Sequence, residues 1–380
     1  MMQAGIAKWR SRKRRTIEQR AGLFGALSLM LVFCWTAAAF AEIKVIEADG
    51  FYIMGDNESK IDARRIAVQE AKRKALEQAG TYVESLTAVT NNQLTKDEIK
   101  MYTAGILMTE VLSEEMRGPS ERPEIYIKIR STIDTDMLTA QIDRYRKNEI
   151  LEDQLKASYK ENDDLKKERD LLVKQLAAQT DKAKAEETRK KLDHVLDREE
   201  ANDDANRVWV SLGNKLEEGR EQEQAVRQAD LDQSVATLER AVAVNPRNQR
   251  AHLMLATIYQ KNGNSTAAEN QLRIAIKQQP SNPAPHMMLG MLLREEGRYQ
   301  DSLKEFHFVA RLRPHYLPAV FYVGITFKDI GKCGKSVQYL NRFLKDKRVN
   351  QYPGKKETAI RAVEECGGAR PDRQRQNREG

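Results

Sequence analysis

The chain has 380 residues, enough for two or three domains, and carries 64 Lys and Arg against 56 Asp and Glu. Its first 41 residues hold seven of the basic residues and one of the acidic ones, which leaves 57 basic and 55 acidic residues in the remainder. This near balance argues against a nucleic-acid partner, because the chain after residue 41 has no overall excess of basic residues apart from a short Arg-rich tail.

The first 41 residues have the layout of a secretory signal peptide. A basic segment, Lys8–Arg20, precedes an apolar run, Ala21–Phe40, and small residues stand at Ala39 and Ala41. This pattern predicts export to the periplasm and cleavage before Glu42. The apolar run is also long enough to span a bilayer, so an inner-membrane anchor formed by the uncleaved signal is the alternative.

Residues 42–143 are predicted to form a small α+β domain. We expect strands at 42–48 and 51–54 joined by a hairpin turn at Asp49-Gly50, a helix over Ser59–Ala79 ending at Gly80, and later strands at 106–112 and 124–133. The helix carries alanines at every fourth position, a stripe that allows close approach to a sheet: Ala63, Ala67, Ala71, Ala75 and Ala79.

The Ala-rich helix continues into the segment Gly80-Thr81-Tyr82-Val83-Glu84-Ser85. With the two closing strands, this segment resembles the N-terminal domain of flagellar assembly protein T and related bacterial envelope lipoproteins. The resemblance covers about 100 residues and implies a periplasmic, envelope-associated module without catalytic activity.

Residues 144–203 are predicted to form a charged helical connector. Leucines recur at heptad-like spacing, as in a coiled coil that would make the protein a homodimer: Leu151, Leu155, Leu165, Leu172 and Leu176. Three polar residues interrupt this seam, namely Ser158, Asn162 and Arg169. A single solvated connector helix is therefore the alternative to a dimer.

From residue 245 to 348 the chain repeats itself every 34 residues. Prolines and two series of glycines recur at this period: Pro246, Pro280 and Pro314; Gly263, Gly297 and Gly331; Gly290 and Gly324. These positions resemble those of the tetratricopeptide repeat, which implies antiparallel helix pairs stacked into a solenoid with a concave surface. The predicted fold is therefore multidomain, α+β followed by an all-α helical solenoid.

The solenoid is predicted to extend over residues 204–366. A first unit is split by an insertion of nine residues, with Trp209, Leu212, Gly213 and Leu216 on its first helix and Ser234, Leu238, Ala241 and Pro246 on its second. Residues 355–366 are expected to form a capping helix, and residues 367–380 a disordered tail.

In this repeat family the first helix of each unit lines the concave face. Carried onto this chain, those positions predict an apolar strip flanked by basic residues: Leu253, Met287, Met291, Phe321 and Ile325, with Arg250, Arg294 and Lys328 beside them. Such a groove suits a protein or peptide partner that has an acidic segment or a free carboxylate. The alternative is that the C-terminal helix or neighbouring units cover part of the strip.

Two cysteines remain after the predicted signal peptide, Cys333 and Cys366. Cys333 opens the second helix of the fourth unit, and Cys366 closes the next, antiparallel helix, so the two ends should be neighbours. Export favours a disulfide between them, and two free thiols are the alternative.

We find no catalytic signature in the sequence. His252 and His286 occupy the same position of successive units, which favours helix packing over a metal-ligand pair, and phosphate-loop and hydrolase motifs are missing. We therefore expect no enzyme activity, no metal and no cofactor. The predicted function is an exported scaffold in bacterial envelope or surface-apparatus assembly, and the alternative is a self-associating structural component of the envelope.

Overall fold

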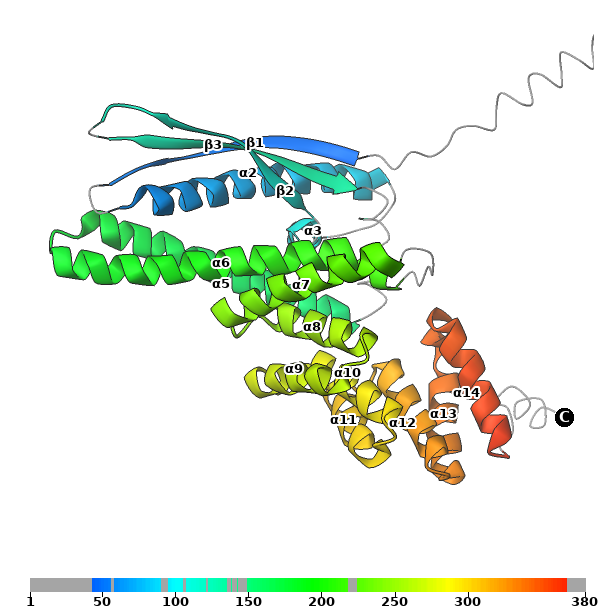
Figure 1. The fold of residues 1–380 in the computed structure, drawn as a ribbon. Helices are drawn as coiled ribbons and strands as arrows, with labels where there is room; N and C mark the ends of the chain where they lie inside the picture. Colours follow the sequence, from blue (N-terminus) through cyan, green and yellow to red (C-terminus); the bar gives the residue numbers. More distant parts are fainter. Residues whose placement is uncertain are drawn as a thin grey trace, which may run out of the picture. The chain divides into compact units, whose positions relative to one another are not determined.

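The structure is a computed structural model, and it describes residues 43–55, 58–89, 95–104, 107–120, 122–134, 138, 142, 149–217 and 224–367. The predicted signal peptide and most of the predicted C-terminal tail lie outside the described residues. The described part begins with a small sheet domain and continues into helices (Figure 1). None of the described helices is long and apolar enough to cross a membrane.

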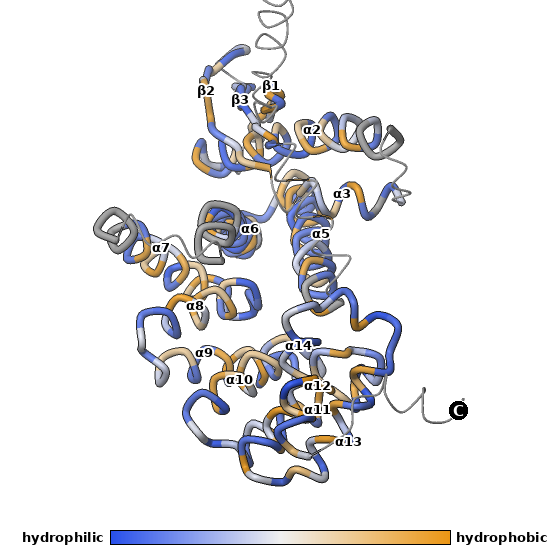
Figure 2. The backbone as a smooth tube through the Cα atoms, turned by 90° about the vertical axis from the view of Figure 1, so that its right-hand side faces the viewer, coloured by the Kyte–Doolittle hydropathy of each residue, from blue (hydrophilic) through white to orange (hydrophobic). Residues whose placement is uncertain are grey.

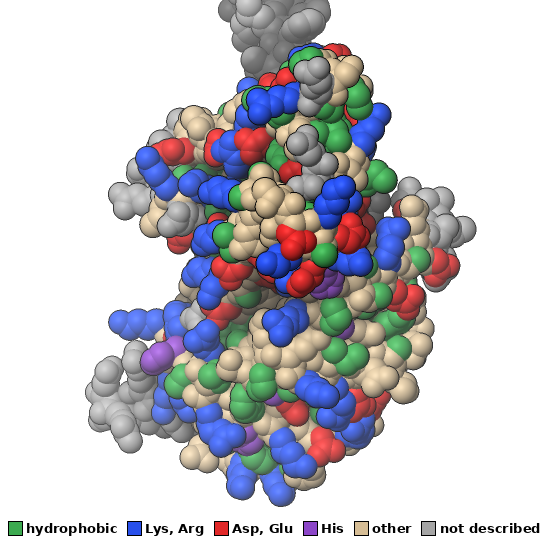
Figure 3. Space-filling model, turned by 90° about the vertical axis from the view of Figure 1, so that its left-hand side faces the viewer, with side chains coloured by type: hydrophobic (Ala, Val, Ile, Leu, Met, Phe, Trp, Pro, Cys, Tyr) green, Lys and Arg blue, Asp and Glu red, His purple; other side chains and the backbone are tan. Residues whose placement is uncertain are grey.

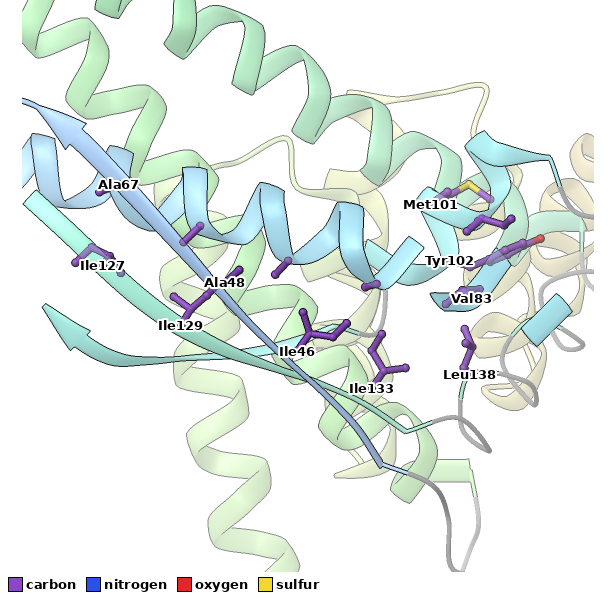
Figure 4. Close-up of a cluster of buried hydrophobic side chains, with 14 of the residues drawn as sticks. Ile46, Ala48, Ala67, Val83, Met101, Tyr102, Ile127, Ile129, Ile133 and Leu138 are labelled. Atoms are coloured by element: carbon purple, nitrogen blue, oxygen red, sulfur yellow. The ribbon is translucent and has the colours of Figure 1, made fainter. Parts of the chain in front are cut away.

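The first domain is a three-stranded sheet with a long helix on one face. Its elements are β1 (Ile43–Ile53), α2 (Lys60–Val89), α3 (Lys96–Ala104), β2 (Met108–Arg117) and β3 (Glu124–Asp134). The strand order is β1-β3-β2, and β2 pairs with β3 in the antiparallel direction. Side chains of β3 alternate between buried and half-buried, as expected for a strand with one face on a core. Figure 4 shows that core, in which Ile46 and Ala48 of β1 and Ile127 and Ile129 of β3 lie against α2.

The predicted hairpin at Asp49-Gly50 is wrong, because β1 runs without a turn to Ile53. Gly50 is needed for a different reason. A Cβ atom there would lie 2.2 Å from the carbonyl oxygen of Ala67 and 2.5 Å from the backbone nitrogen of Ala71. The glycine and the alanine stripe, whose five side chains are fully buried, together let α2 approach β1 closely.

Helix α2 also continues past its predicted end at Gly80 and reaches Val89. A glycine costs a helix only about 1 kcal/mol, so neighbouring structure can carry the helix through it. Gly80 is buried, but there is room for a Cβ atom, which would make only an ordinary contact with Ile99 at 3.9 Å.

The connector forms two helices, α5 (Glu149–Ala178) and α6 (Lys182–Glu217), which pack against each other. Both are drawn largely in the hydrophilic colour in Figure 2. The contacts between them run in opposite order along the two helices, so the pair is an antiparallel hairpin: Asn162 contacts Asn202, and Arg169, further along α5, contacts Glu199, which lies earlier in α6.

The leucine seam of α5 is therefore filled by the same chain. Leu165, Leu172 and Leu176 pack with residues of α6 and with Ile66 of α2, so these side chains are buried within one chain. The side chain of Leu151 lies outside the described residues. Two of the residues that appeared to interrupt the seam have partners on α6: Asn162 accepts from Asn202 at 2.8 Å, and Arg169 donates to the buried Glu199 carboxylate at 3.0 Å. Burial raises the pKa of Glu199, and Arg169 partly offsets that effect.

The remaining helices are paired as the 34-residue period predicts. They are α7 (Gln224–Val244), α8 (Gln249–Lys261), α9 (Ser265–Gln278), α10 (Pro283–Glu295), α11 (Tyr299–Leu312), α12 (Leu317–Asp329), α13 (Cys333–Lys345) and α14 (Pro353–Glu365), with a short 3-10 helix, η1 (Lys347–Gln351), before the last. The first unit uses the end of α6 as its first helix, so connector and repeats share one continuous helix.

Two glycine series have separate structural causes. Gly263, Gly297 and Gly331 have φ values of 74°, 75° and 74°, the left-handed conformation that turns one helix of a unit into the next. Gly290 and Gly324 instead lie where the two helices of a unit touch. A Cβ atom on Gly290 would come within 2.5 Å of the Phe306 ring.

The last two helices are linked covalently. Cys333 at the start of α13 and Cys366 just after α14 form a disulfide, with their Cα atoms 5.1 Å apart. The predicted C-terminal helix is present as α14, which buries Ala359, Ala362 and Val363 against the fourth unit.

Candidate partner-binding surface

The eight residues predicted to line the groove lie on α8, α10 and α12, the first helices of three successive units. The apolar ones are mostly inaccessible. Exposure is only 2% for Leu253, 5% for Met287, 5% for Phe321 and 6% for Ile325, whereas Met291 is half-buried. The strip is therefore not an open apolar groove along its whole length.

Connector helix α5 covers the strip at the second and third units. Ile150 at its start is 5% exposed and belongs to the same core as Leu253 and Met287. An ion pair between Asp153 of α5 and Arg313, at the turn before α12, holds the same end of the connector. A helix of the same chain removes apolar side chains at a concave surface from water just as a bound partner would.

Helix α14 covers the strip at the fourth unit. Phe321 and Ile325 share a core with Ala359, Ala362 and Val363, and the Phe321 ring lies 5.3 Å from that of Phe343. The sequence analysis left this covering by the C-terminal helix open as the alternative. At Phe321 and Ile325 the C-terminal helix does cover the predicted strip.

The three basic residues of the strip all have partners within the chain. Arg294 donates to Asp329 at 2.6 Å, and Lys328 forms an ion pair with Glu365 of α14. Arg250 donates to Asn206 at 2.5 Å, and its guanidinium stacks 4.7 Å from the centre of the Trp209 ring. These pairs weaken the charge argument for an acidic ligand at this strip.

Three side chains beside the covered positions, on α10, α12 and α14, are half-buried rather than buried. We refer to Met291, Tyr322 and Lys355 together as the concave strip. The Lys355 ammonium lies 5.8 Å from the centre of the Tyr322 ring. Burial raises the pKa of Tyr322 and lowers the pKa of Lys355. This strip combines a flexible thioether, an aromatic ring and a cation.

Sequence reasoning missed Lys355, although the repeat period contains the signal. Lys355 follows Phe321 by 34 residues and Met287 by 68, so it holds the same position on the capping helix as they hold in their units. Extending the period into α14 identifies it. Tyr322 was missed because it neighbours a groove position in the sequence without occupying one.

A separate polar cavity of about 400 Å³ lies between α5 and the start of α8. Its wall includes Glu161 and Arg198 of the connector and Arg247 and Gln249 of the repeats. Gln249 is 8% exposed, and its side-chain oxygen has no hydrogen-bond partner among the described residues. Opposite charges line this cavity in comparable number, so it favours no ligand charge.

The two equivalent histidines serve packing, as expected. The His252 ring contacts the Pro246 carbonyl oxygen at 2.8 Å and Gln271 at 2.7 Å, and the His286 ring makes the equivalent contacts with Pro280 and Glu305. Both rings are buried. Within the part of the chain that the structure describes, no group of three or more His, Cys, Asp or Glu side chains is arranged to hold a metal ion.

Comparison with known proteins supports the repeat fold. A tetratricopeptide repeat model matches residues 225–292, which correspond to α7–α10. No curated protein matches the chain. The described C-terminal part is thus a tetratricopeptide-like helical solenoid, a fold consistent with a protein–protein interaction scaffold.

Several solved structures are similar to part of this chain at low identity. MamA is 14% identical over 42% of this chain and 96% of its own, with a TM-score of 0.31. YrrB, described as a TPR protein with an unusual peptide-binding site, is 19% identical over 50% of this chain and 88% of its own, with a TM-score of 0.33. PilF of Pseudomonas aeruginosa is 18% identical over 46% and 79%, with a TM-score of 0.33.

Proposed function

We propose that this chain is an exported, non-enzymatic scaffold that holds a protein partner on the concave face of its repeats and works in assembly of the bacterial envelope or a surface apparatus. Export rests on the basic, apolar and small-residue pattern of the first 41 residues. The envelope role rests on the resemblance of residues 42–143 to modules of envelope proteins.

The concave strip is the observation that supports partner binding most directly. Solenoids of this type commonly hold partners on the concave surface. Here most of that surface is already filled by α5 and α14, and the accessible remainder carries Met291, Tyr322 and Lys355. A lysine whose pKa is lowered by burial gains a favourable contact when an acceptor from a partner approaches it.

A matched pair of lysines tests this proposal. Lys355 and Lys356 are neighbours on α14 and both half-buried, but Lys355 faces the Tyr322 ring whereas Lys356 is bonded to Asn350. Wild-type chain and the variants Lys355→Glu and Lys356→Glu are used as bait on envelope fractions. We expect Lys355→Glu to lose the captured partner and Lys356→Glu to retain it, with equal helical content in both.

The outcomes separate the possibilities. Equal capture by both variants places the partner elsewhere on the chain, and capture of no partner by the wild type from any envelope fraction counts against the scaffold itself. Phe321 is not a suitable position for this test, because its burial makes any charged substitution a folding defect.

A second candidate function is self-association as a structural component of the envelope. It is favoured by four exposed apolar side chains on one face of edge strand β1, in two pairs separated by Glu47 and Asp49, with exposure of 60% for Ile43, 49% for Val45, 47% for Phe51 and 54% for Ile53. An exposed apolar edge strand is a template for pairing with a second copy. Sedimentation of the exported chain over a concentration series tests this candidate: a monomer throughout rejects it, and a dimer abolished by Phe51→Lys supports it.

A further inference from the structure

We propose that a pocket on the outer side of the repeats, between α11 and α13, binds the carboxylates of an acidic protein segment. This inference rests on the proposed function in that the segment belongs to a protein partner. We call this site the outer pocket and define it by Leu303, His307, Arg311, Phe327, Lys332 and Lys335, which line a cavity of about 590 Å³.

The pocket is built from α11 and α13, the second helices of two successive units, together with Phe327 of α12. His307 and Arg311 stand one helical turn apart on α11, and Lys332 and Lys335 lie at the start of α13. Between them the floor is apolar, with Leu303 6% and Phe327 7% exposed. A polar rim around an apolar floor is the usual composition of a recognition site.

Aromatic contacts fix the centre of the pocket. The His307 ring meets the Phe327 ring edge-on at 6.0 Å and the Tyr339 ring at 5.7 Å. The Lys335 ammonium lies 5.4 Å from the centre of the Phe327 ring. These contacts hold the imidazole and one cation in place before any ligand binds, which lowers the ordering cost of binding.

The rim is positively charged and is not neutralised internally. Among the described residues, no carboxylate pairs with Arg311, Lys332 or Lys335, in contrast with the paired basic residues of the predicted groove. Lys304, which also borders the pocket, is paired with Asp301 at 2.7 Å. The positive potential affects the central ring: burial, Arg311 and Lys335 lower the pKa of His307.

Charge over the repeats points to the same class of ligand. Residues 249–350 contain 16 Lys and Arg against seven Asp and Glu, a net charge of +9 in a chain that is nearly balanced after residue 41. Figure 3 shows Lys and Arg side chains interspersed with apolar ones over the repeats, in the lower half of that view. A surface of this kind attracts an acidic partner and speeds its association.

An acidic protein segment fits better than a phosphate group or a membrane. The cations are spread around an apolar and aromatic floor, so a ligand gains most when it places an apolar side chain on Phe327 and carboxylates at Arg311, Lys332 and Lys335. A single phosphate group fills little of a 590 Å³ cavity and leaves the floor uncovered.

The test uses the exported chain and a fluorescent peptide of sequence Glu-Glu-Leu-Glu-Glu, with Gln-Gln-Leu-Gln-Gln as the uncharged probe. The variant is Arg311→Gln with Lys332→Gln and Lys335→Gln. The matched control removes three cations elsewhere on the repeats that are equally exposed, by Lys277→Gln, Lys345→Gln and Lys347→Gln. All six positions are on the surface, so both variants should fold, which circular dichroism checks.

We expect the acidic peptide to bind the wild type, with affinity falling as salt rises, and the pocket variant to bind about tenfold or more weakly. The control variant should lose much less, and the uncharged peptide should bind neither. In NMR titrations the bound carboxylates should raise the pKa of the His307 imidazole, a change that nonspecific charge attraction elsewhere would not produce.

Equal loss of peptide binding in the pocket and control variants overturns the proposal, as does an unchanged His307 titration. The proposal is also overturned if inorganic phosphate or vesicles containing phosphatidylglycerol bind through the same three cations and the acidic peptide does not displace them. The proposed function fails separately: a chain that captures no envelope partner can still bind the peptide through the outer pocket, and capture that is lost only in Lys355→Glu leaves the outer pocket without a role.

Discussion

Replacing Gly50 with alanine should loosen the first domain. The added Cβ atom would lie 2.2 Å and 2.5 Å from backbone atoms of Ala67 and Ala71, and 2.9 Å from the Ala71 Cβ. Backbone atoms inside a helix have no rotamer through which to give way, so α2 must retreat from β1 by about 1 Å to restore ordinary contact distances. Five alanines of α2 with fully buried side chains share that interface.

Overpacking of this kind typically costs about 1–3 kcal/mol, and partial loss of the alanine contacts adds to it. The stiffer unfolded chain offsets about 0.4–1 kcal/mol. We therefore expect Gly50→Ala to lower the free energy of opening of α2 by about 2 kcal/mol. Gly80→Ala, in the same helix but with its nearest neighbour at 3.9 Å, should instead stabilise α2 by about 0.5–1 kcal/mol.

Hydrogen exchange of α2 and β1 peptides in the exported chain measures both changes, because it reports local opening without requiring the whole multidomain chain to unfold in one step. Slower or unchanged exchange of α2 in Gly50→Ala would refute the close-approach argument. Faster exchange in both variants would mean that α2 tolerates no added methyl group, and the specific role of Gly50 would fail.

Three further predictions concern other parts of the chain. Burial and then the neighbouring Asp62 carboxylate raise the pKa of Asp193 to about 6, above its unfolded value, so its ionised form destabilises the folded state. Above pH 6.5, Asp193→Asn should therefore stabilise the chain by about 1–2 kcal/mol, a figure already discounted for solvent screening. Urea unfolding at several pH values should show this gain disappearing as the pH falls towards 4. Thiol counting under denaturing, non-reducing conditions should find neither Cys333 nor Cys366 free in exported protein, and two titratable thiols would reject the disulfide. Phe321→Ala should lower the stability by about 3–5 kcal/mol, because it leaves a cavity in the α12–α14 core. If the variant unfolds at the same temperature as the wild type and only fails to bind its partner, Phe321 lines an open groove after all.

The repeat architecture follows from the sequence because its signals are local and periodic. Each unit needs a left-handed residue between its helices and a small residue where they touch, and glycines recur at both places every 34 residues. The alanine stripe of α2 is local in the same sense, since a four-residue period places those side chains on one helix face.

Prediction from the sequence was less successful where the same residue pattern fits two different structures. Asp49-Gly50 is a common hairpin signal, yet Gly50 is required by a helix that lies some 20 residues further along the chain. The heptad leucines of α5 are equally suited to a second copy and to an internal partner. Arg169 appeared to break the seam because Glu199, which neutralises it, follows 30 residues later.

The sequence by itself thus determined the repeat unit and its helix pairs, and it predicted the positions that line the concave side. Only the tertiary structure decided that α5 and α14 occupy most of that side, and that the cations left without carboxylate partners include those at α11 and α13. The reason is physical: periodicity fixes which face of a helix a residue occupies, whereas burial and ion pairing depend on which distant segment arrives at that face. Ile150 reaches Leu253 and Glu365 reaches Lys328 through contacts that no local pattern encodes.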